Sequence, residues 1–239
     1  MTELCLYQTV HVARGRARNV AAHAALLDAA SCALFGRSYA PDPARLAARI
    51  EALAAAERYP AGVSGFVRLE LTPEGGERLL AAGISLYDGY ALRSLSPAAV
   101  TLRYDPLCPE APTSAREAAE LLAARLAALR GAAAAVRCDA EERLLTADGA
   151  PLFAVRGHTV YTAPAPASVE GCLAREAVRA AGLTLREEPL RRRELPRAEE
   201  LFYADHRGIT ALSRCDGQPL MTLVAERVAE ALEGLFPKK

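Results

Sequence analysis

Three prolines between Pro106 and Pro112 constrain the fold of this chain more than any other feature of its sequence. Proline removes a backbone hydrogen-bond donor and fixes φ, so neither a helix interior nor a central strand passes easily through this stretch. Strand-like and helical patterns stand on both sides of it, and 239 residues are enough for two cores. The sequence therefore predicts two domains, residues 1–105 and 113–239, joined by a linker at 106–112.

The first half alternates between short strand-like runs and helical patterns. Alternating apolar residues predict strands, and apolar residues at helical spacing predict helices. The expected strands are residues 5–12, 63–71, 79–87 and 100–104, and the expected helices are residues 19–34 and 43–57. Asn19 is expected to cap the first helix, and Asp42-Pro43 to start the second. The turn Glu74-Gly75-Gly76-Glu77 predicts a hairpin between the second and third strands.

The second half shows short strands between three helical patterns. The expected helices are residues 114–129, 169–181 and 219–232, and the expected strands are residues 134–138, 143–146, 151–155, 159–162, 183–188, 201–203 and 208–213. Ser114 and Glu117 form a capping-box pattern, and Leu122, Leu126 and Leu129 predict the apolar face of the first helix. Strands and helices interspersed in both halves predict an α+β fold.

Composition and charge exclude several functional classes. The 29 basic and 29 acidic residues balance, which argues against a non-specific nucleic-acid surface. The sequence contains no run of 18 apolar residues and therefore predicts no membrane span. Its first residues lack the basic-then-apolar order of an export signal. The six cysteines form no CxxC pair and are expected to be free thiols in a reducing cytoplasm. Four isolated histidines at no ligand spacing predict no metal site.

Lysine is confined to one place in the sequence. Of the 29 basic residues, only Lys238 and Lys239 are lysine, and the others are arginine. A guanidinium group stays protonated and cannot replace an amine as a nucleophile. Both lysines follow a predicted terminal helix and Pro237, where chains are usually solvated. The sequence therefore predicts no lysine-dependent chemistry in the body of the fold.

Several runs of the second half resemble one known family. The runs LLTADGAPLFAVRGHTVYTAP, VEGCLAREAVRAAGLTLREEPL and AEELFYADHRGITALSRCDGQP are similar to the class IV aminotransferases, which include aminodeoxychorismate lyases. In the first half YQTVHVARGRARNVAAHAALL and GFVRLELTPEGGER are similar to the same family, more loosely. The resemblance implies a two-domain α+β fold, a homodimer and pyridoxal phosphate as cofactor. It also implies transamination of a carboxylated amine, or pyruvate elimination from aminodeoxychorismate.

The residues that perform this chemistry in the family differ here. The family's Schiff-base lysine matches Thr113, its pyridinium-pairing glutamate matches Thr146, and its phosphate-reaching arginine matches Leu26. Pyridoxal chemistry needs an amine for the Schiff base and an acid on the pyridine nitrogen. The resemblance therefore predicts a degenerate member, a pseudoenzyme without covalent cofactor. Two alternatives are an active enzyme with lysine-independent chemistry and a pyridoxal-phosphate enzyme with a lysine from the tail or a neighbouring subunit.

The turn Asp205-His206-Arg207-Gly208 is the most polar segment of an apolar strand–turn–strand pattern. In one interpretation Arg207 binds a carboxylate or phosphate and His206 is a general acid–base. In the other, Asp205 pairs with Arg207 and the turn is structural. The resemblance places this region, with Thr210, at the cofactor and substrate side.

A second candidate site lies at the helix predicted over residues 169–181. By resemblance, Arg175 matches an arginine of the helix start that binds phosphate, so Arg175 is a candidate for binding a small anion. The hydroxyls of Thr113 and Ser114 are a further candidate, or they cap the helix that begins there. Arg68 matches a strand arginine of the family and is interpreted as structural. The expected partners are a small anionic metabolite, an active homologue or a second copy in a homodimer, but neither nucleic acid nor membrane.

Overall fold

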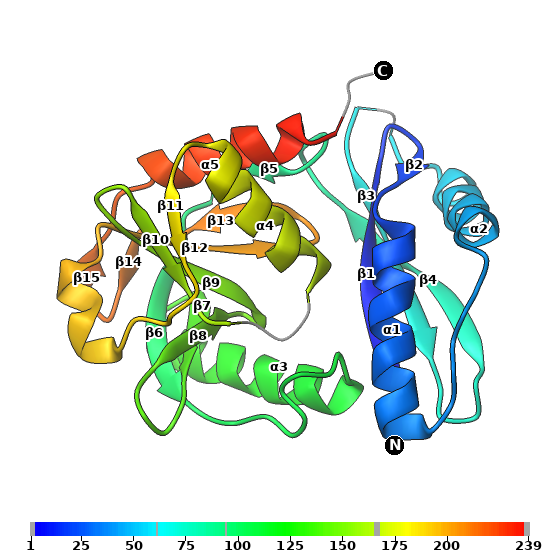
Figure 1. Cartoon of the computed structure of the whole chain (residues 1–239), viewed down its shortest axis with the longest axis horizontal. Helices are drawn as coiled ribbons and strands as arrows, with labels where there is room; N and C mark the ends of the chain where they lie inside the picture. The colour runs from blue at the N-terminus through cyan, green and yellow to red at the C-terminus, as the bar shows by residue number, and fades with distance from the viewer. Residues whose placement is uncertain (1–2, 61, 94, 165–167, 237–239) are drawn as a thin grey trace. The chain divides into compact units, whose positions relative to one another are not determined.

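The computed structural model describes residues 3–60, 62–93, 95–164 and 168–236 (Figure 1). Two compact units divide the chain: one comprises Met1–Gly89 with Cys108–Glu117, and the other Tyr90–Leu107 with Ala118–Lys239. The predicted linker contains one of the crossings between them, at Leu107–Cys108. The other two crossings, after Gly89 and after Glu117, lie outside the predicted linker, and the last falls within a helix.

The first unit is an antiparallel sheet with two helices on one face (Figure 1). Its strands, in the order β2-β1-β3-β4, are β1 (Leu6–Ala13), β2 (Arg16–Ala17), β3 (Gly65–Leu71) and β4 (Glu77–Ile84). The helices are α1 (Val20–Phe35) and α2 (Pro43–Ala56). Because side chains alternate along a strand, Val10 and Val67 point to the same face and meet Leu27 and Ile50 of the helices. The expected strands, hairpin and helices of this unit are confirmed, with ends shifted by a few residues.

The two helix starts of this unit differ in their caps. The Asp42 carboxylate accepts the backbone N–H of Arg45 at 2.8 Å, and Pro43 occupies the first turn, as predicted. Asn19 does precede α1, but its backbone is left-handed with φ of 55° and its side chain makes no capping hydrogen bond. Asn19 is therefore the N-cap residue of α1, as predicted, but its side chain does not take part in the cap.

The second unit is a mixed sheet with three helices. The main strand order is β15-β14-β6-β7-β8-β9-β12-β13-β5. In addition, β10 pairs with β9, and β11 pairs with β10. The strands are β5 (Ala91–Leu92), β6 (Ala98–Arg103), β7 (Ala134–Cys138), β8 (Leu144–Ala147), β9 (Ala150–Arg156), β10 (Thr159–Thr162), β11 (Thr184–Arg186), β12 (Glu200–Asp205), β13 (Gly208–Ala211), β14 (Arg214–Cys215) and β15 (Gln218–Pro219). The helices are α3 (Ser114–Leu129), which begins in the first unit, α4 (Val169–Ala180) and α5 (Leu223–Gly234), with a short 3-10 helix η1 (Arg192–Arg197).

Helices α4 and α5 pack against each other and against β12 and β13. The rings of Phe153 and Phe202 stack at the centre of this core, 5.1 Å apart and fully buried. Helix α5 begins four residues later than predicted, because Gln218 and Pro219 pair with β14 instead. The buried Glu200 carboxylate on β12 accepts the backbone N–H groups of Val224 and Ala225, so a distant strand caps this helix.

Helix α3 buries a different face from the one that the sequence predicts. Ala123 and Ala127 pack inward against Leu102 and Ala135 of the neighbouring strands. The leucines at 122, 126 and 129 point outward, so their expected role as the buried face was wrong. Alanine lets a helix approach a sheet closely, and here the small side chains face the sheet.

The fold class is α+β, as predicted. All six cysteines are free thiols. Within the described ranges, no helix is long and apolar enough to cross a membrane. Over the same ranges, no three His, Cys, Asp or Glu side chains are grouped as a metal site would require.

Candidate functional site

Most of the candidate ligand-binding residues lie together around the β12–β13 turn of the second unit. The Arg207 guanidinium binds the Asp205 carboxylate through Nε at 2.8 Å and also through Nη2. The backbone N–H of Arg207 donates to the same carboxylate at 2.8 Å. Thr210 on β13 is buried and its hydroxyl accepts from Arg93 at 3.2 Å. The Asp205–Arg207 pair that the structural interpretation predicts is present.

The charges of this turn are interdependent. Burial opposes ionisation of Asp205, but His206 and Arg207 outweigh it and hold the pKa of Asp205 below its usual value. Burial lowers the pKa of His206, and the positive charges of Arg207 and Arg93 lower it further against the attraction of Asp205. The titrations of Asp205 and His206 are therefore coupled.

Two acids beside this turn have raised pKa values. Burial raises the pKa of Glu170, in the first turn of α4, to about 8, and the negative charge of Asp205 adds to the shift. Burial also raises the pKa of Asp148, which accepts the N–H of Ala135 at 2.9 Å and the hydroxyl of Tyr203 at 3.4 Å. Burial and the neighbouring carboxylates raise the pKa of Tyr203 to about 12. Proton-carrying groups thus gather beside the β12–β13 turn.

Arg175 and Thr146 have other surroundings. Arg175 donates to the carbonyl oxygen of Ala163 at 3.0 Å and lies 4.0 Å from the Glu187 carboxylate. Thr146 is a buried residue of β8 whose backbone pairs with Arg137 and Pro151. Neither has a hydrogen bond to the β12–β13 turn among the described residues. Their service to a ligand or cofactor stays a prediction from the sequence.

Thr113 caps α3 in the first unit. Its hydroxyl accepts the backbone N–H of Arg116 at 3.0 Å. Ser114 does not cap: its hydroxyl accepts the N–H of Cys5 at 3.1 Å and donates to the carbonyl oxygen of Glu3. The predicted capping box of Ser114 and Glu117 was therefore wrong, and capping by Thr113 is confirmed.

Replacing Thr113 with alanine is expected to lower the free energy of unfolding by about 1 kcal/mol, because it removes the hydroxyl that caps α3. Serine at the same position keeps a hydroxyl and is the matched control. Chemical denaturation of both variants measures the difference. If the alanine and serine variants are equally stable, the hydroxyl contributes nothing to the helix.

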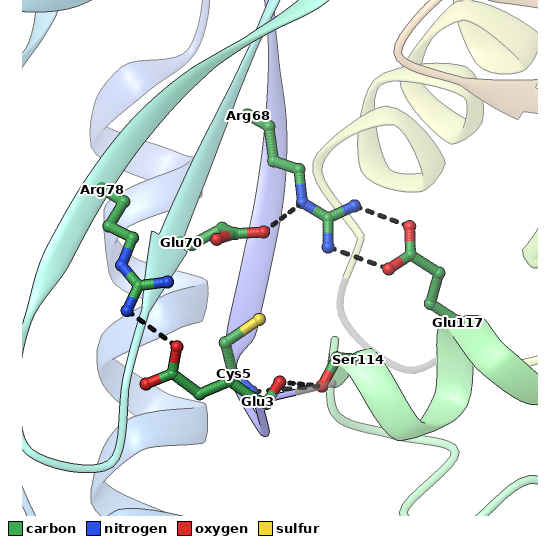
Figure 2. A pocket seen from close by; sticks show the side chains of 7 residues that line it. All are labelled: Glu3, Cys5, Arg68, Glu70, Arg78, Ser114 and Glu117. Carbon is green, nitrogen blue, oxygen red and sulfur yellow. Dashed lines mark hydrogen bonds and ion pairs between the residues drawn. The ribbon is translucent and has the colours of Figure 1, made fainter. Parts of the chain in front are cut away.

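A small cavity of about 220 Å³ lies in the first unit (Figure 2). It is lined by the ion pairs of Arg68 and Arg78 with glutamates and by the first residues of α3. The Arg68 guanidinium forms two parallel hydrogen bonds with Glu117, at 2.6 and 2.8 Å, and a third with Glu70 at 2.8 Å. It also lies 3.9 Å from the centre of the Tyr7 ring. The contacts of Arg68 therefore all join residues of the first unit.

The sequence did not identify four of the residues in these places. Glu117 and Glu170 fall in helix first turns, where acids are common on exposed surfaces. The sequence around Asp148, which precedes a glycine, is typical of an ordinary turn. Cys5, whose thiol pKa is raised by burial and by Glu70, reads as one apolar position of a strand. In each case only the distant neighbours give the side chain its environment.

The match to known proteins covers most of the chain. The family model described as "Amino-transferase class IV" matches residues 5–205. The chain belongs to the class IV aminotransferases.

Solved structures of this family share the fold of the chain. A branched-chain aminotransferase of Thermoproteus uzoniensis has a TM-score of 0.78 at 17% identity, over 96% of this chain and 84% of that one. The Escherichia coli branched-chain aminotransferase has a TM-score of 0.79 at 16% identity, over 97% and 85%. An aminotransferase of Brucella abortus, solved with bound PLP, has a TM-score of 0.78 at 18% identity, over 95% and 87%. No curated protein sequence matches the chain.

Several side chains of this chain differ from the groups that the resemblance expects at the cofactor. The described ranges contain no lysine, and Lys238 and Lys239 lie outside them. At the position matched to the family's lysine, the Thr113 hydroxyl is engaged with α3. At the start of α4, where the resemblance places phosphate, the buried Glu170 brings an acid and Arg175 binds a backbone carbonyl. An acid beside a phosphate would repel it when ionised.

Proposed function

We propose that this protein is a class IV aminotransferase by descent that forms no covalent pyridoxal-phosphate adduct and serves a non-catalytic role. The observation that carries the proposal is the confinement of lysine to Lys238 and Lys239. Transamination in this family requires a primary amine that holds the cofactor and moves a proton. Threonine at 113 and 146 removes the amine and the pyridinium acid together.

The contacts of the candidate side chains support a structural role for the residues that the resemblance places at the cofactor and substrate. Arg207 is held by Asp205 through several hydrogen bonds, and Arg175 by the carbonyl of Ala163. A small anionic metabolite, which we include in the proposal, would compete with Asp205 for Arg207. If the partner is instead an active homologue, Arg207 can stay bound to Asp205.

The expected result with purified protein and pyridoxal phosphate is neither internal-aldimine absorbance nor a stoichiometric adduct after borohydride reduction. The Brucella abortus aminotransferase, which binds PLP, is the positive control. Peptide mapping separates a specific adduct from scattered labelling of the α-amino group. The paired variant Lys238→Arg with Lys239→Arg identifies any contribution of the tail.

A stoichiometric adduct on Lys238 or Lys239, lost in the arginine variant and accompanied by amino transfer to a keto acid, would overturn the proposal. It would establish that the tail supplies the amine. Turnover without any adduct would instead support lysine-independent chemistry.

A further inference from the structure

The cavity of the first unit has more acidic than basic side chains in its wall (Figure 2). The acids are Glu3, Glu70 and Glu117, and the bases are Arg68 and Arg78. Three carboxylates against two guanidinium groups leave one negative charge. Arg78 pairs with Glu3 at 2.7 Å, whereas the single guanidinium of Arg68 is shared by Glu70 and Glu117. The surplus therefore lies beside Arg68, and the cavity attracts a cation and repels a carboxylate.

One oxygen atom of Glu70 is available to a ligand. Glu70 Oε1 accepts the Nε–H of Arg68 at 2.8 Å, but within the described part of the chain Glu70 Oε2 has no hydrogen bond. Both oxygens of Glu117, in contrast, are bound by Arg68. The Glu70 side chain is only 13% exposed, and its strand β3 is fixed between β1 and β4. An ionised carboxylate oxygen in such a place is a strong acceptor for an ammonium group.

The thiol of Cys5, which also lines the cavity, senses the same charge. Burial raises the pKa of Cys5, and the negative charge of Glu70 raises it further, whereas Ser114 and Arg68 each have a smaller opposite effect. The effect of the Glu70 charge exceeds that of the Arg68 charge at this atom, as the surplus of acid predicts. The neutral sulfur is weakly polar and polarisable, so it can contact a hydrocarbon group.

We propose that this cavity binds a small aliphatic ammonium ion, whose charged end contacts Glu70 Oε2 and whose hydrocarbon part contacts the Cys5 thiol. A volume of about 220 Å³ equals that of about seven water molecules, which suits a ligand of roughly five to eight heavy atoms. Such a ligand makes few contacts and stays partly in water, so its dissociation constant is expected to be on the order of millimolar. The site takes a cation in the first unit and does not depend on the function proposed above.

Titration of the whole chain with two ions of equal length and opposite charge, followed by NMR, tests the proposal. The ions are n-butylammonium and butyrate, each compared with sodium chloride at the same ionic strength. The reporter is the backbone N–H of Cys5, which donates to the Ser114 hydroxyl at 3.1 Å. Its signal is expected to shift with butylammonium until it saturates, and to stay in place with butyrate. Equal shifts with both ions, or no saturable shift up to about 50 mM, would overturn the proposal.

Replacing Glu70 with glutamine is expected to weaken butylammonium binding about tenfold, because the charge is lost. The glutamine oxygen can still accept the Nε–H of Arg68, which preserves the contact within the wall. Glu74→Gln, an exposed acid in the turn between β3 and β4, is the matched control and should leave binding unchanged. If Glu74→Gln weakens binding as much as Glu70→Gln does, the overall charge of the chain attracts the ion, and the proposed site is wrong.

Replacing Arg78 with glutamine is a second test that leaves Glu70 and Arg68 in place. It removes a positive charge from the wall and is expected to strengthen butylammonium binding about threefold. Arg45→Gln, an exposed arginine of α2 outside the cavity, is its control and should have no effect. The loss of an exposed ion pair costs little stability, and circular dichroism melts check that every variant folds. Weaker binding by Arg78→Gln than by the unchanged chain would contradict the proposal.

Discussion

Replacing Gly208 with alanine is expected to lower the free energy of unfolding by about 3 kcal/mol or more. Gly208 has a φ of 120°, a region that side chains rarely adopt. A Cβ atom at this position would lie 2.4 Å from the carbonyl oxygen of Ala91, which is backbone and cannot turn aside. The clash falls where β13 pairs with β5, directly after the Asp205–Arg207 turn. Strain and overlap therefore act together.

The matched control is Gly217→Ala. Gly217 also has a positive φ, 84°, but a Cβ atom there would meet nothing within 4 Å. Replacing Gly217 with alanine is expected to lower the free energy of unfolding by about 1–2 kcal/mol, because of the left-handed backbone alone. Chemical denaturation gives both values. Hydrogen exchange of the Arg93 N–H, which donates to the carbonyl of Ile209 at 2.9 Å, reports whether the β5 pairing opens first. Equal losses at both glycines would show that the close approach to Ala91 is relieved at no cost.

Replacing Glu170 with glutamine is expected to remove a large pH dependence of stability. The pKa of Glu170 is about 8 in the folded protein, against 4.5 for an ordinary glutamate. Between these two values the folded state holds a proton that the unfolded state has lost. The free energy of unfolding therefore falls as the pH rises from 4.5 to 8, by on the order of 4 kcal/mol, and levels off above that range.

Glutamine resembles the protonated carboxyl and does not titrate. The two proteins are therefore expected to be similarly stable near pH 4.5, and the variant increasingly more stable than the unchanged chain up to pH 8. Denaturation at a series of pH values measures the difference. Glu176→Gln, an exposed acid on the same helix, is the control and should leave the pH profile unchanged. Parallel profiles for the unchanged chain and the Glu170 variant would mean that Glu170 is ionised in the fold.

Predictions from local chemistry agree with the structure where one short segment decides the conformation. Asp42-Pro43 starts α2, and β3 and β4 form a hairpin around the predicted turn at residues 74–77. Their backbone preferences act within a few residues. The Asp205–Arg207 pair is of this kind, since the two side chains stand two residues apart.

Predictions failed or were missing where a distant segment competes for the same group. The Glu117 carboxylate binds Arg68, 49 residues away, rather than the backbone of its own helix. Glu200 reaches α5 from a strand 24 residues earlier. The leucines of α3 have the spacing of a buried face, but the sheet accepts the alanine side. Periodicity identifies the faces of a helix and leaves open which one the sheet will bury.

The sequence by itself determined the α+β order of elements, the family and the confinement of lysine to the last two positions, since each depends only on residue identity and spacing. The tertiary structure alone decided that Arg175 binds a backbone carbonyl of its own chain, that Glu170 is buried, and that α3 presents leucines to solvent. Burial and pairing depend on neighbours distant in sequence, and those neighbours set the pKa values of the buried groups and the face of each helix that stays exposed.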